Sequence, residues 1–233
     1  MQHEGLEITW LGHAAFRFRL DDGTTLLIDP FLNGNPLCPP EEMSPEEVDA
    51  VFITHGHADH IGDVVDIAGS AGAAVFSIFE IKNWLMWQGL GDEQTIGLNK
   101  GGTVTAPGGV EATFVHAVHS SGIYGDERMP TGGSPGGWVL NFPDGPTIYH
   151  AGDTDVFGDM SLIGDLWEPT IACLPIGGHF TMDPRSAAKA ARLLGVETVI
   201  PMHFGTFPIL AGRPDQLRDH AGGDFGVLEM AVG

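Results

Sequence analysis

Short apolar runs and polar turns alternate through the first third of the chain. Partial apolar/polar alternation over residues 7–11 and 15–20 predicts two strands. Asp21, Asp22 and Gly23 form a turn signal, which predicts a hairpin into a third strand over residues 24–28. The apolar run 51–53 predicts a short buried strand. This part of the chain therefore reads as strand-rich.

The remainder of the chain alternates between strand and helix signals. A helix is expected from residue 59 or 60 to 68. Further strands are expected over 74–78, 110–118, 138–142, 147–149, 171–174 and 198–202, and further helices over 79–87, 156–165 and 184–194. Asp183 is a good N-cap before Pro184, and Gly195 stands where a helix should stop, so the ends of the last helix are well defined.

The segment from Thr54 to His60 carries the densest chemistry in the chain. Its six positions 55–60 hold three imidazoles and one carboxylate: His55, His57, Asp59 and His60. Imidazole nitrogens and carboxylate oxygens suit zinc and neighbouring first-row metals. Four such groups exceed what one tetrahedral metal takes together with a catalytic water. Further ligands elsewhere would therefore make a two-metal site.

Three more ligand-type residues follow apolar runs later in the chain. His119 comes after the run 110–118, and Asp153 comes after 147–149. His203 follows the run 198–202. A sheet that gathers the ends of its strands at one edge would bring these side chains together with the first group.

The order H-x-H-x-D-H, lone His, Gly-Asp-Thr and last His resembles the metallo-β-lactamase superfamily. The nearest likeness is to its small single-domain metal-dependent hydrolases (UPF0173-like), which are similar to the lactonase and N-acyl phospholipase D relatives. The supporting motifs are WLGHA at 10–14, IDPF at 28–31, GNP at 34–36, HSS at 119–121, GGH at 177–179 and PMHFG at 201–205. The resemblance implies an α/β fold, a four-layer αβ/βα sandwich of two similar halves, with residues 1–233 as one domain.

The resemblance also implies a ligand set and a reaction. It assigns His55, His57 and His119 to one metal, Asp59, His60 and His203 to a second, and Asp153 to a position between them. Two divalent ions would share a hydroxide that attacks a small ester, lactone or phosphodiester. Zinc is the first expectation, and manganese, nickel, cobalt and iron stay open because mixed His/Asp sites accept them.

Two further histidines are candidates for the chemistry itself. His13 and His179 are expected at the rim of a cleft formed by strand ends, where each could donate a proton or contact an oxyanion. A structural, hydrogen-bonded role stays open for both. Asp59 is counted with them as a candidate catalytic residue. His116 should face away from His119 and is expected to be structural.

Residues behind the ligands should fix the orientation of the imidazole rings. Asp29 follows the third strand, and His150 and Thr154 flank Asp153, so these three are the candidates. Two long loops, 31–45 and 120–137, begin beside predicted site residues, and we expect them to cover the substrate; disorder is the alternative.

The charge and composition of the chain limit the classes of partner that it is expected to bind. Thirty-one acidic residues face ten basic ones, a formal charge of −21, which repels nucleic acid and anionic membranes and could reflect a high-salt host. No apolar run approaches the ~20 residues of a membrane helix. The first residues lack the pattern of a signal peptide, and Cys38 and Cys173 lack metal-binding spacing. We therefore expect a cytoplasmic enzyme with reduced thiols and a small-molecule substrate, whose oligomeric state, homo-oligomer included, stays open.

Two other functions compete with this expectation. A thioesterase or glyoxalase-type hydrolase would use a similar site, but those relatives carry extra C-terminal segments, and only about thirty residues follow His203. A non-catalytic metal-binding scaffold is the other alternative. Structural zinc sites are usually closed by four protein ligands, so an open site would argue against the scaffold.

Overall fold

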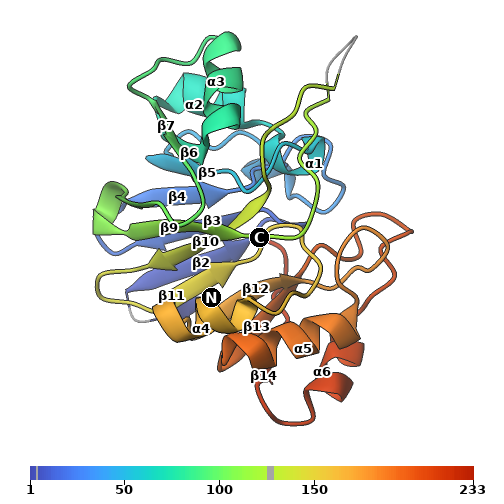
Figure 1. The fold of residues 1–233 in the computed structure, drawn as a ribbon. Helices are drawn as coiled ribbons and strands as arrows, with labels where there is room; N and C mark the ends of the chain where they lie inside the picture. Colours follow the sequence, from blue (N-terminus) through green and yellow to red (C-terminus); the bar gives the residue numbers. More distant parts are fainter. Residues whose placement is uncertain (4, 125–128) are drawn as a thin grey trace.

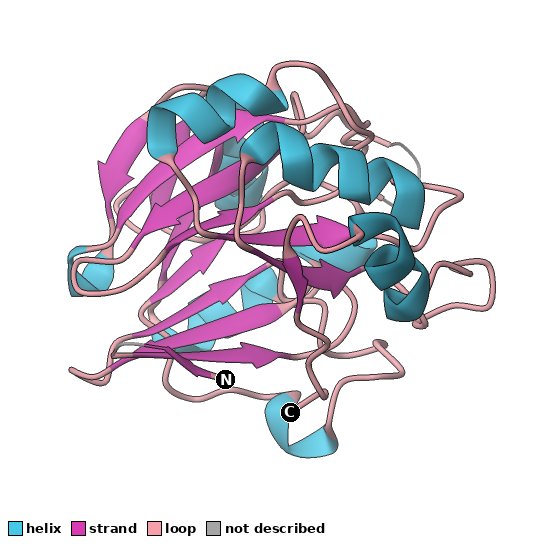
Figure 2. Cartoon of the chain, turned by 90° about the horizontal axis from the view of Figure 1, so that it is seen from below, coloured by secondary structure: helices cyan, strands magenta, loops and turns pink. Residues whose placement is uncertain are grey.

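The computed structural model describes residues 1–3, 5–124 and 129–233. Within these residues, the strands form two seven-stranded sheets, and α-helices lie outside them (Figure 1). Figure 2 shows the same arrangement turned by 90°, with the helices beside the layers of strands. The predicted α/β fold, a four-layer αβ/βα sandwich, is confirmed.

The first sheet is built from the first half of the chain in sequence order. Its strands are β1 (Gln2–His3), β2 (Leu6–Trp10), β3 (Phe16–Leu20), β4 (Thr25–Ile28), β5 (Ala50–Phe52), β6 (Ala74–Ile78) and β7 (Thr95–Leu98). The pairings from β1 to β4 are antiparallel, and those from β4 to β7 are parallel. Helices α1 (Ala58–Ile61) and α2 (Val64–Ala71) connect β5 to β6, and α3 (Phe79–Trp87) connects β6 to β7.

The second sheet repeats this plan. Its strands are β8 (Thr103–Thr105), β9 (Glu111–His116), β10 (Gly136–Asn141), β11 (Thr147–His150), β12 (Ile171–Pro175), β13 (Thr198–Met202) and β14 (Gly226–Val227). Three antiparallel pairings are again followed by three parallel ones. Helices α4 (Met160–Trp167), α5 (Pro184–Leu194) and α6 (Pro214–Ala221) connect the parallel strands. Each strand of the first sheet therefore corresponds to the strand numbered seven higher in the second sheet, so that β1 corresponds to β8 and β2 to β9.

Aromatic side chains fill the space between the sheets. Trp138 of β10 is fully buried and packs against Phe52 of β5 at a ring distance of 5.1 Å. Its indole N–H donates to the carbonyl oxygen of Ile53 at 3.1 Å. Phe18 of β3 contacts Phe142, which follows β10, at 5.6 Å. Burial of large apolar side chains is the main contribution to the stability of a fold. These contacts therefore fix how the two sheets pack against each other.

Several predicted elements match the structure closely. The strand Ala74–Ile78 and the helices Phe79–Trp87 and Pro184–Leu194 have the predicted bounds. Asp183 caps α5 by accepting a hydrogen bond from the Ser186 amide at 2.7 Å, and Gly195 ends the helix in the left-handed region.

The prediction of one helix reaching residue 68 is wrong. The chain forms two short helices, α1 and α2, separated at Gly62. A Cβ at Gly62 would lie 2.9 Å from both the Phe31 Cα and the Pro30 carbonyl oxygen. The break therefore lets the loop after β4 pass close to α1, a tertiary constraint that periodicity does not record.

Other elements are shifted or were not predicted. The helix expected over 156–165 begins at Met160, and the strand expected to reach residue 118 ends at His116. Strands β1, β7, β8 and β14 and helix α6 were missed. These strands have between two and four residues each, too short for a clear alternation, and α6 carries few apolar residues.

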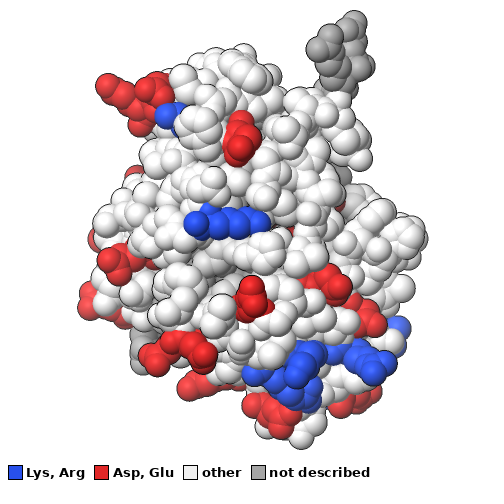
Figure 3. Space-filling model, viewed as in Figure 1, with Lys and Arg blue, Asp and Glu red and all other residues white. Residues whose placement is uncertain are grey.

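The surface carries basic side chains on one face, and both cysteines lie in the interior. On the face drawn in Figure 3, basic side chains gather over α5 and α6, where Arg192 pairs with Asp224 at 2.6 Å. Among the described residues, each helix falls short of the length and apolarity that crossing a bilayer requires. Cys38 and Cys173 are free and buried, and burial raises the pKa of Cys38 to about 11.

Candidate metal centre

The predicted ligands converge at one edge of the sandwich. They lie in the segments beyond the C-terminal ends of β5, β9, β11 and β13, so both sheets contribute. Their side chains fall into two clusters, and within each cluster the ligand atoms lie within 4.8 Å of one another. Two ligand atoms that each lie 2.0–2.2 Å from the same metal ion are about 2.9–3.5 Å apart. Distances in this range between donor atoms are therefore compatible with binding to one ion.

The first cluster contains His55, His57, His119 and Asp153. His55 Nε2 lies 2.9 Å from His57 Nδ1, and His119 Nε2 lies 3.3 Å from the same nitrogen. His119 Nε2 is 3.5 Å from Asp153 Oδ2. These spacings match donors around one ion.

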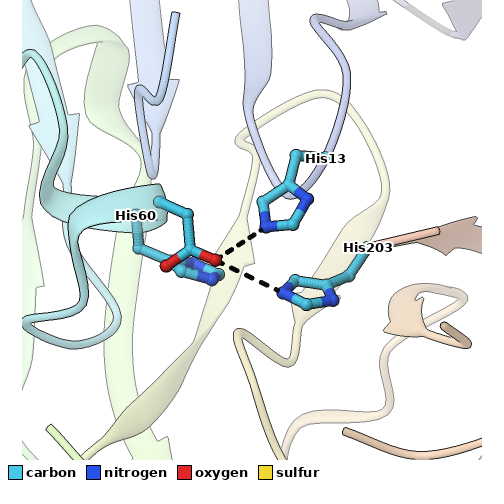
Figure 4. Close-up of side chains that lie close together, drawn as sticks. His13, His60 and His203 are labelled. Carbon is cyan, nitrogen blue, oxygen red and sulfur yellow. Dashed lines mark hydrogen bonds and ion pairs between the residues drawn. The ribbon is translucent and has the colours of Figure 1, made fainter. Parts of the chain in front are cut away.

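The second cluster contains His13, Asp59, His60 and His203. Figure 4 shows the rings of His13, His60 and His203 approaching from three separate segments. Asp59 Oδ2 lies 3.1 Å from His13 Nε2 and 3.9 Å from His203 Nε2. The ring of His13 is 3.9 Å from that of His203 and 5.7 Å from that of His60.

Asp153 lies between the clusters. Its Oδ1 is 3.3 Å from His60 Nε2, and its Oδ2 is 3.1 Å from His203 Nε2. His60 Nε2, His203 Nε2 and Asp153 Oδ1 are buried without a hydrogen-bond partner. Buried polar atoms are nearly always paired, so these orphaned atoms and their chemical types fit binding of divalent cations.

A buried carboxylate organises the imidazoles from behind. Asp29 accepts hydrogen bonds from the Thr54 amide at 2.8 Å and the Thr54 hydroxyl at 2.6 Å. Its Oδ2 is also 2.7 Å from His60 Nδ1, while Thr54 Oγ1 is 3.0 Å from His55 Nδ1. The outward nitrogens of both rings are therefore held, and the inward nitrogen of each ring would take a metal in place of a proton.

The charges of the cluster support one another. Burial lowers the pKa of His55 well below its usual value. Burial acts in the same direction on His60, but Asp153 and Asp29 outweigh it and raise the pKa of His60 well above its usual value. Burial would raise the pKa of Asp153, yet His203 and His60 hold it well below the usual value. Buried carboxylates that stay ionised require positive charge beside them, as a cation would supply.

Strained backbone turns aim several of these side chains. His13, Asp29, His179 and His203 have φ values of 56°, 45°, 60° and 54°. For a non-glycine residue this left-handed conformation costs about 1–2 kcal/mol. Each of these residues follows the end of a strand, β2, β4, β12 or β13. Among the described non-glycine residues with positive φ, only Glu168, at the end of α4, lies outside these strand-end segments, so the strain gathers mainly around the candidate site, as is typical of functional positions.

Close backbone approaches also require glycine beside the site. A Cβ at Gly152 would lie 2.7 Å from the Thr54 Cβ, and one at Gly177 would lie 2.2 Å from the His203 carbonyl oxygen. These contacts bring the Asp153 segment against the His55 segment, and the loop after β12 against His203.

His150 and Thr154 act on the backbone rather than on a ligand ring. His150 is buried, its Nε2–H donates to the Ala14 carbonyl at 3.0 Å, and its Nδ1 accepts from the Gly152 amide at 3.2 Å. Thr154 Oγ1 accepts from the Val118 amide at 3.0 Å. They join the segments that carry Asp153, His13 and His119.

The structure places His13 and His179 very differently. His13 is fully buried within the second cluster, not at a rim, and burial lowers its pKa to about 4 although its hydrogen bond to Asp59 opposes this. His179 is exposed, belongs to neither cluster, and packs against Phe180 at 4.4 Å. His116 is exposed beside Lys100 and belongs to neither cluster, and His220 is exposed. The side chain of His3 lies outside the described part.

The two long loops both touch the site. Phe31 of the first loop lies 5.8 Å from His13, ring to ring. In the second loop, Ser121 Oγ accepts a hydrogen bond from the Gly56 amide at 3.0 Å, and Ser120 Oγ lies 3.2 Å from His57 Nε2. Residues 125–128 of that loop lie outside the described residues.

Three hydroxyl residues at the site were not predicted. Thr54, Ser120 and Thr206 lie within hydrogen-bond distance of the nitrogens of His55, His57 and His13 at 3.0, 3.2 and 2.9 Å. Serine and threonine are too common along the chain for their type to give a signal. Only their proximity in sequence to the candidate ligands His55, His119 and His203 could have suggested them.

Comparison with known proteins identifies the family. The model of the beta-lactamase superfamily domain matches residues 24–204. The chain is 51% identical over 217 residues to a UPF0173 metal-dependent hydrolase of Koribacter versatilis, covering 93% of this chain and 92% of that protein. A relative of the same name from Solibacter usitatus is 48% identical over 218 residues, covering 94% and 93% of the two chains.

A solved structure agrees. Igni18, described as a novel metallo hydrolase from Ignicoccus hospitalis, superposes with a TM-score of 0.85 at 39% identity, covering 98% of this chain and 96% of its own. The fold and the site thus define a metallo-β-lactamase-type protein. The chain belongs to the beta-lactamase superfamily, among relatives named UPF0173 metal-dependent hydrolases, and the predicted class of enzyme, a metal-dependent hydrolase, is confirmed at this level.

Proposed function

We propose that the chain is a dinuclear metal-dependent hydrolase of a small ester, lactone or phosphodiester. The observation that carries this proposal is the pair of adjacent clusters, each with three imidazoles and one carboxylate. Asp153, the carboxylate of the first cluster, also lies 3.3 and 3.1 Å from His60 and His203 of the second. His55, His57 and His119 would hold one ion, and Asp59, His60 and His203 the other, with Asp153 contacting both. When bound, the ions would lower the pKa of a shared water toward ~7 and polarise the scissile acyl or phosphoryl group.

The remaining residues would position and isolate the reaction. Asp29 and Thr54 hold the rings of His60 and His55, which keeps both ligands preorganised. Ser120 does the same for His57 through its Nε2. The side chain of His179, exposed on a strained turn beyond β12, is free to meet a substrate and to exchange a proton with its leaving group.

Exposed apolar side chains beside the site favour an acyl substrate over a highly charged one. Val118 precedes His119 and is 44% exposed, and Phe180 follows His179 and is 57% exposed. Phe207, 36% exposed, lies 5.7 Å from His13. Such surfaces suit the apolar part of an ester or lactone. Zinc stays our first choice of metal, with manganese, nickel, cobalt and iron as alternatives.

The same proposal covers domain organisation and cellular setting. Each cluster draws side chains from both sheets, which supports residues 1–233 acting as one domain. Free buried cysteines support a reducing, cytoplasmic setting. A small-molecule substrate is proposed on the same basis, and the oligomeric state stays open.

The experiment that tests the function is a hydrolysis panel. Protein stripped with a chelator and reloaded separately with zinc, manganese, nickel, cobalt or iron would be assayed on a lactone, a carboxylic ester, a phosphodiester, a thioester and a β-lactam. Turnover of the lactone or ester that requires reloading is the expected result. Metal-dependent turnover of the thioester alone would favour the thioesterase alternative, and two bound metals without any turnover would favour a scaffold.

Replacing His179 with alanine is expected to lower kcat by about 10²–10⁴-fold, the usual contribution of a positioned acid or base. Its ring lies outside both clusters, so metal content should not change. Steady-state kinetics and elemental analysis of the same sample measure both quantities, with His116→Ala as a control for loss of an exposed imidazole. Unchanged kcat would leave His179 without a catalytic role, and lost metal would make it part of the metal site.

A further inference from the structure

His13 is the one member of the second cluster that the superfamily pattern does not assign to a metal. Its Nε2 lies 3.1 Å from Asp59 Oδ2, a spacing that two ligands of one ion would have. Its ring, together with those of His60 and His203, surrounds the same space in Figure 4. The side chain is fully buried, so it is not a surface group that happens to lie near.

The symmetry of the fold gives His13 a counterpart. Strands β2 and β9 hold the same place in the two sheets, second in the order of each half. His13 lies three residues beyond the end of β2 at Trp10, and His119 lies three residues beyond the end of β9 at His116. His119 falls in the first cluster and His13 in the second. Each half of the fold thus delivers one imidazole from the same position to one cluster.

Two hydrogen bonds hold the backbone of His13 in place. Its carbonyl oxygen accepts from the His203 amide at 2.9 Å and from the Trp10 indole N–H at 3.0 Å. Its φ of 56° places it in the left-handed region, as at His203. These bonds fix the position from which the ring enters the cluster.

The outward nitrogen of His13 is held in the same way as that of His55. Nδ1 of His13 lies 2.9 Å from Thr206 Oγ1, whose hydroxyl can donate onward to the Phe204 carbonyl at 3.5 Å. Nδ1 of His55 lies 3.0 Å from Thr54 Oγ1, whose hydroxyl donates onward to Asp29. A proton on Nδ1 that is donated to Thr206 would leave Nε2 as the ligand atom facing Asp59.

We propose that His13 is a protein ligand of the second metal, joining Asp59, His60 and His203. The inference rests on the proposed two-metal function and extends it. Three imidazoles and a carboxylate would then hold each metal, and Asp153, 3.1 Å from His203, would also face the second. Five protein donors and a water would exceed the four-coordination that zinc usually takes, so the alternatives that accept six ligands would suit the second position, and zinc stays the first choice for the first position.

The test uses Co²⁺ as the probe on the full chain. Apoprotein is titrated by calorimetry, and the fully loaded protein is examined by paramagnetic proton NMR for shifted, exchangeable imidazole N–H signals. We expect two equivalents in the unmodified protein. In His13→Ala, the Kd of one equivalent should rise by more than about 100-fold, beyond the 10–100-fold contribution of an outer contact, and one N–H signal should disappear.

Two further variants separate a ligand from a residue that only positions Asp59. His13→Gln keeps an amide donor for Asp59, so a positioning role would be rescued in this variant, whereas a ligand role would not. His116→Ala removes an exposed imidazole outside both clusters and should leave both equivalents unchanged. Retention of the tight first equivalent in each variant reports that the site remains folded.

The possible results distinguish a failure of the ligand role of His13 from a failure of the two-metal function. Two equivalents in the unmodified protein, with the same affinities and the same number of N–H signals in His13→Ala, would overturn the ligand role and leave the two-metal function standing. Rescue by His13→Gln would overturn it as well, in favour of positioning. A single equivalent in the unmodified protein would overturn the two-metal function itself.

Discussion

Replacing Asp153 with asparagine is expected to lower kcat at least about 10³-fold, a loss of about 4 kcal/mol of transition-state stabilisation. Its carboxylate contacts His60 and His203 at 3.3 and 3.1 Å and His119 at 3.5 Å, so it serves both clusters. Asparagine keeps the shape but removes the negative charge, and one of its two former acceptors becomes a donor facing imidazole nitrogens. Metal content should therefore fall together with turnover.

The measurement is kcat on the substrate class that the panel identifies, with elemental analysis of the same protein. Asp155→Asn is the matched control, because Asp155 is exposed and only two residues away, and its carboxylate accepts from the Val156 amide at 2.7 Å. The control should keep full activity. An Asp153→Asn protein with two metals and normal kcat would contradict the assigned role.

Replacing Asp29 with alanine is expected to lower the free energy of unfolding by about 3–5 kcal/mol, the cost of removing one partner from a buried charged network. The side chain is fully buried and accepts from the Thr54 amide and hydroxyl, and its Oδ2 is 2.7 Å from His60 Nδ1. Without it, these buried donors lose their acceptor and His60 loses a neighbouring negative charge.

Urea unfolding followed by circular dichroism measures this loss, and a chelator in every sample keeps weaker metal binding from adding to the difference. Asp22→Asn is the control, because Asp22 is exposed in the turn between β3 and β4, and its unfolding curve should match that of the unmodified protein. A change below about 1 kcal/mol for Asp29→Ala would show that the buried network contributes little to the fold.

The candidate ligands could be predicted from the sequence because their signal is local. His55, His57, Asp59 and His60 fall within six residues after an apolar run, and the later ligands each follow a strand. Sheet geometry then gathers strand ends at one edge, so little further information was needed to expect them together. The same locality explains why α3 and α5 were predicted with their observed bounds.

The buried position of His13 could not be predicted from the local sequence. Its depth depends on the loop after β2 packing against His203 and Phe207, residues about 190 positions away, through contacts that no local pattern encodes. The break between α1 and α2 has a similar origin, since it depends on the backbone of Phe31 passing Gly62. Short edge strands were missed because the partner strand, not their own sequence, defines them.

A titration of activity against bound metal tests whether the chain is a two-metal hydrolase. Apoprotein receives metal in steps, and hydrolysis and metal content are measured on the same samples. With paired clusters around Asp153, we expect no turnover without metal and a rise that reaches its plateau at two equivalents per chain. Full turnover in the chelated protein, or a plateau at one equivalent, would contradict it.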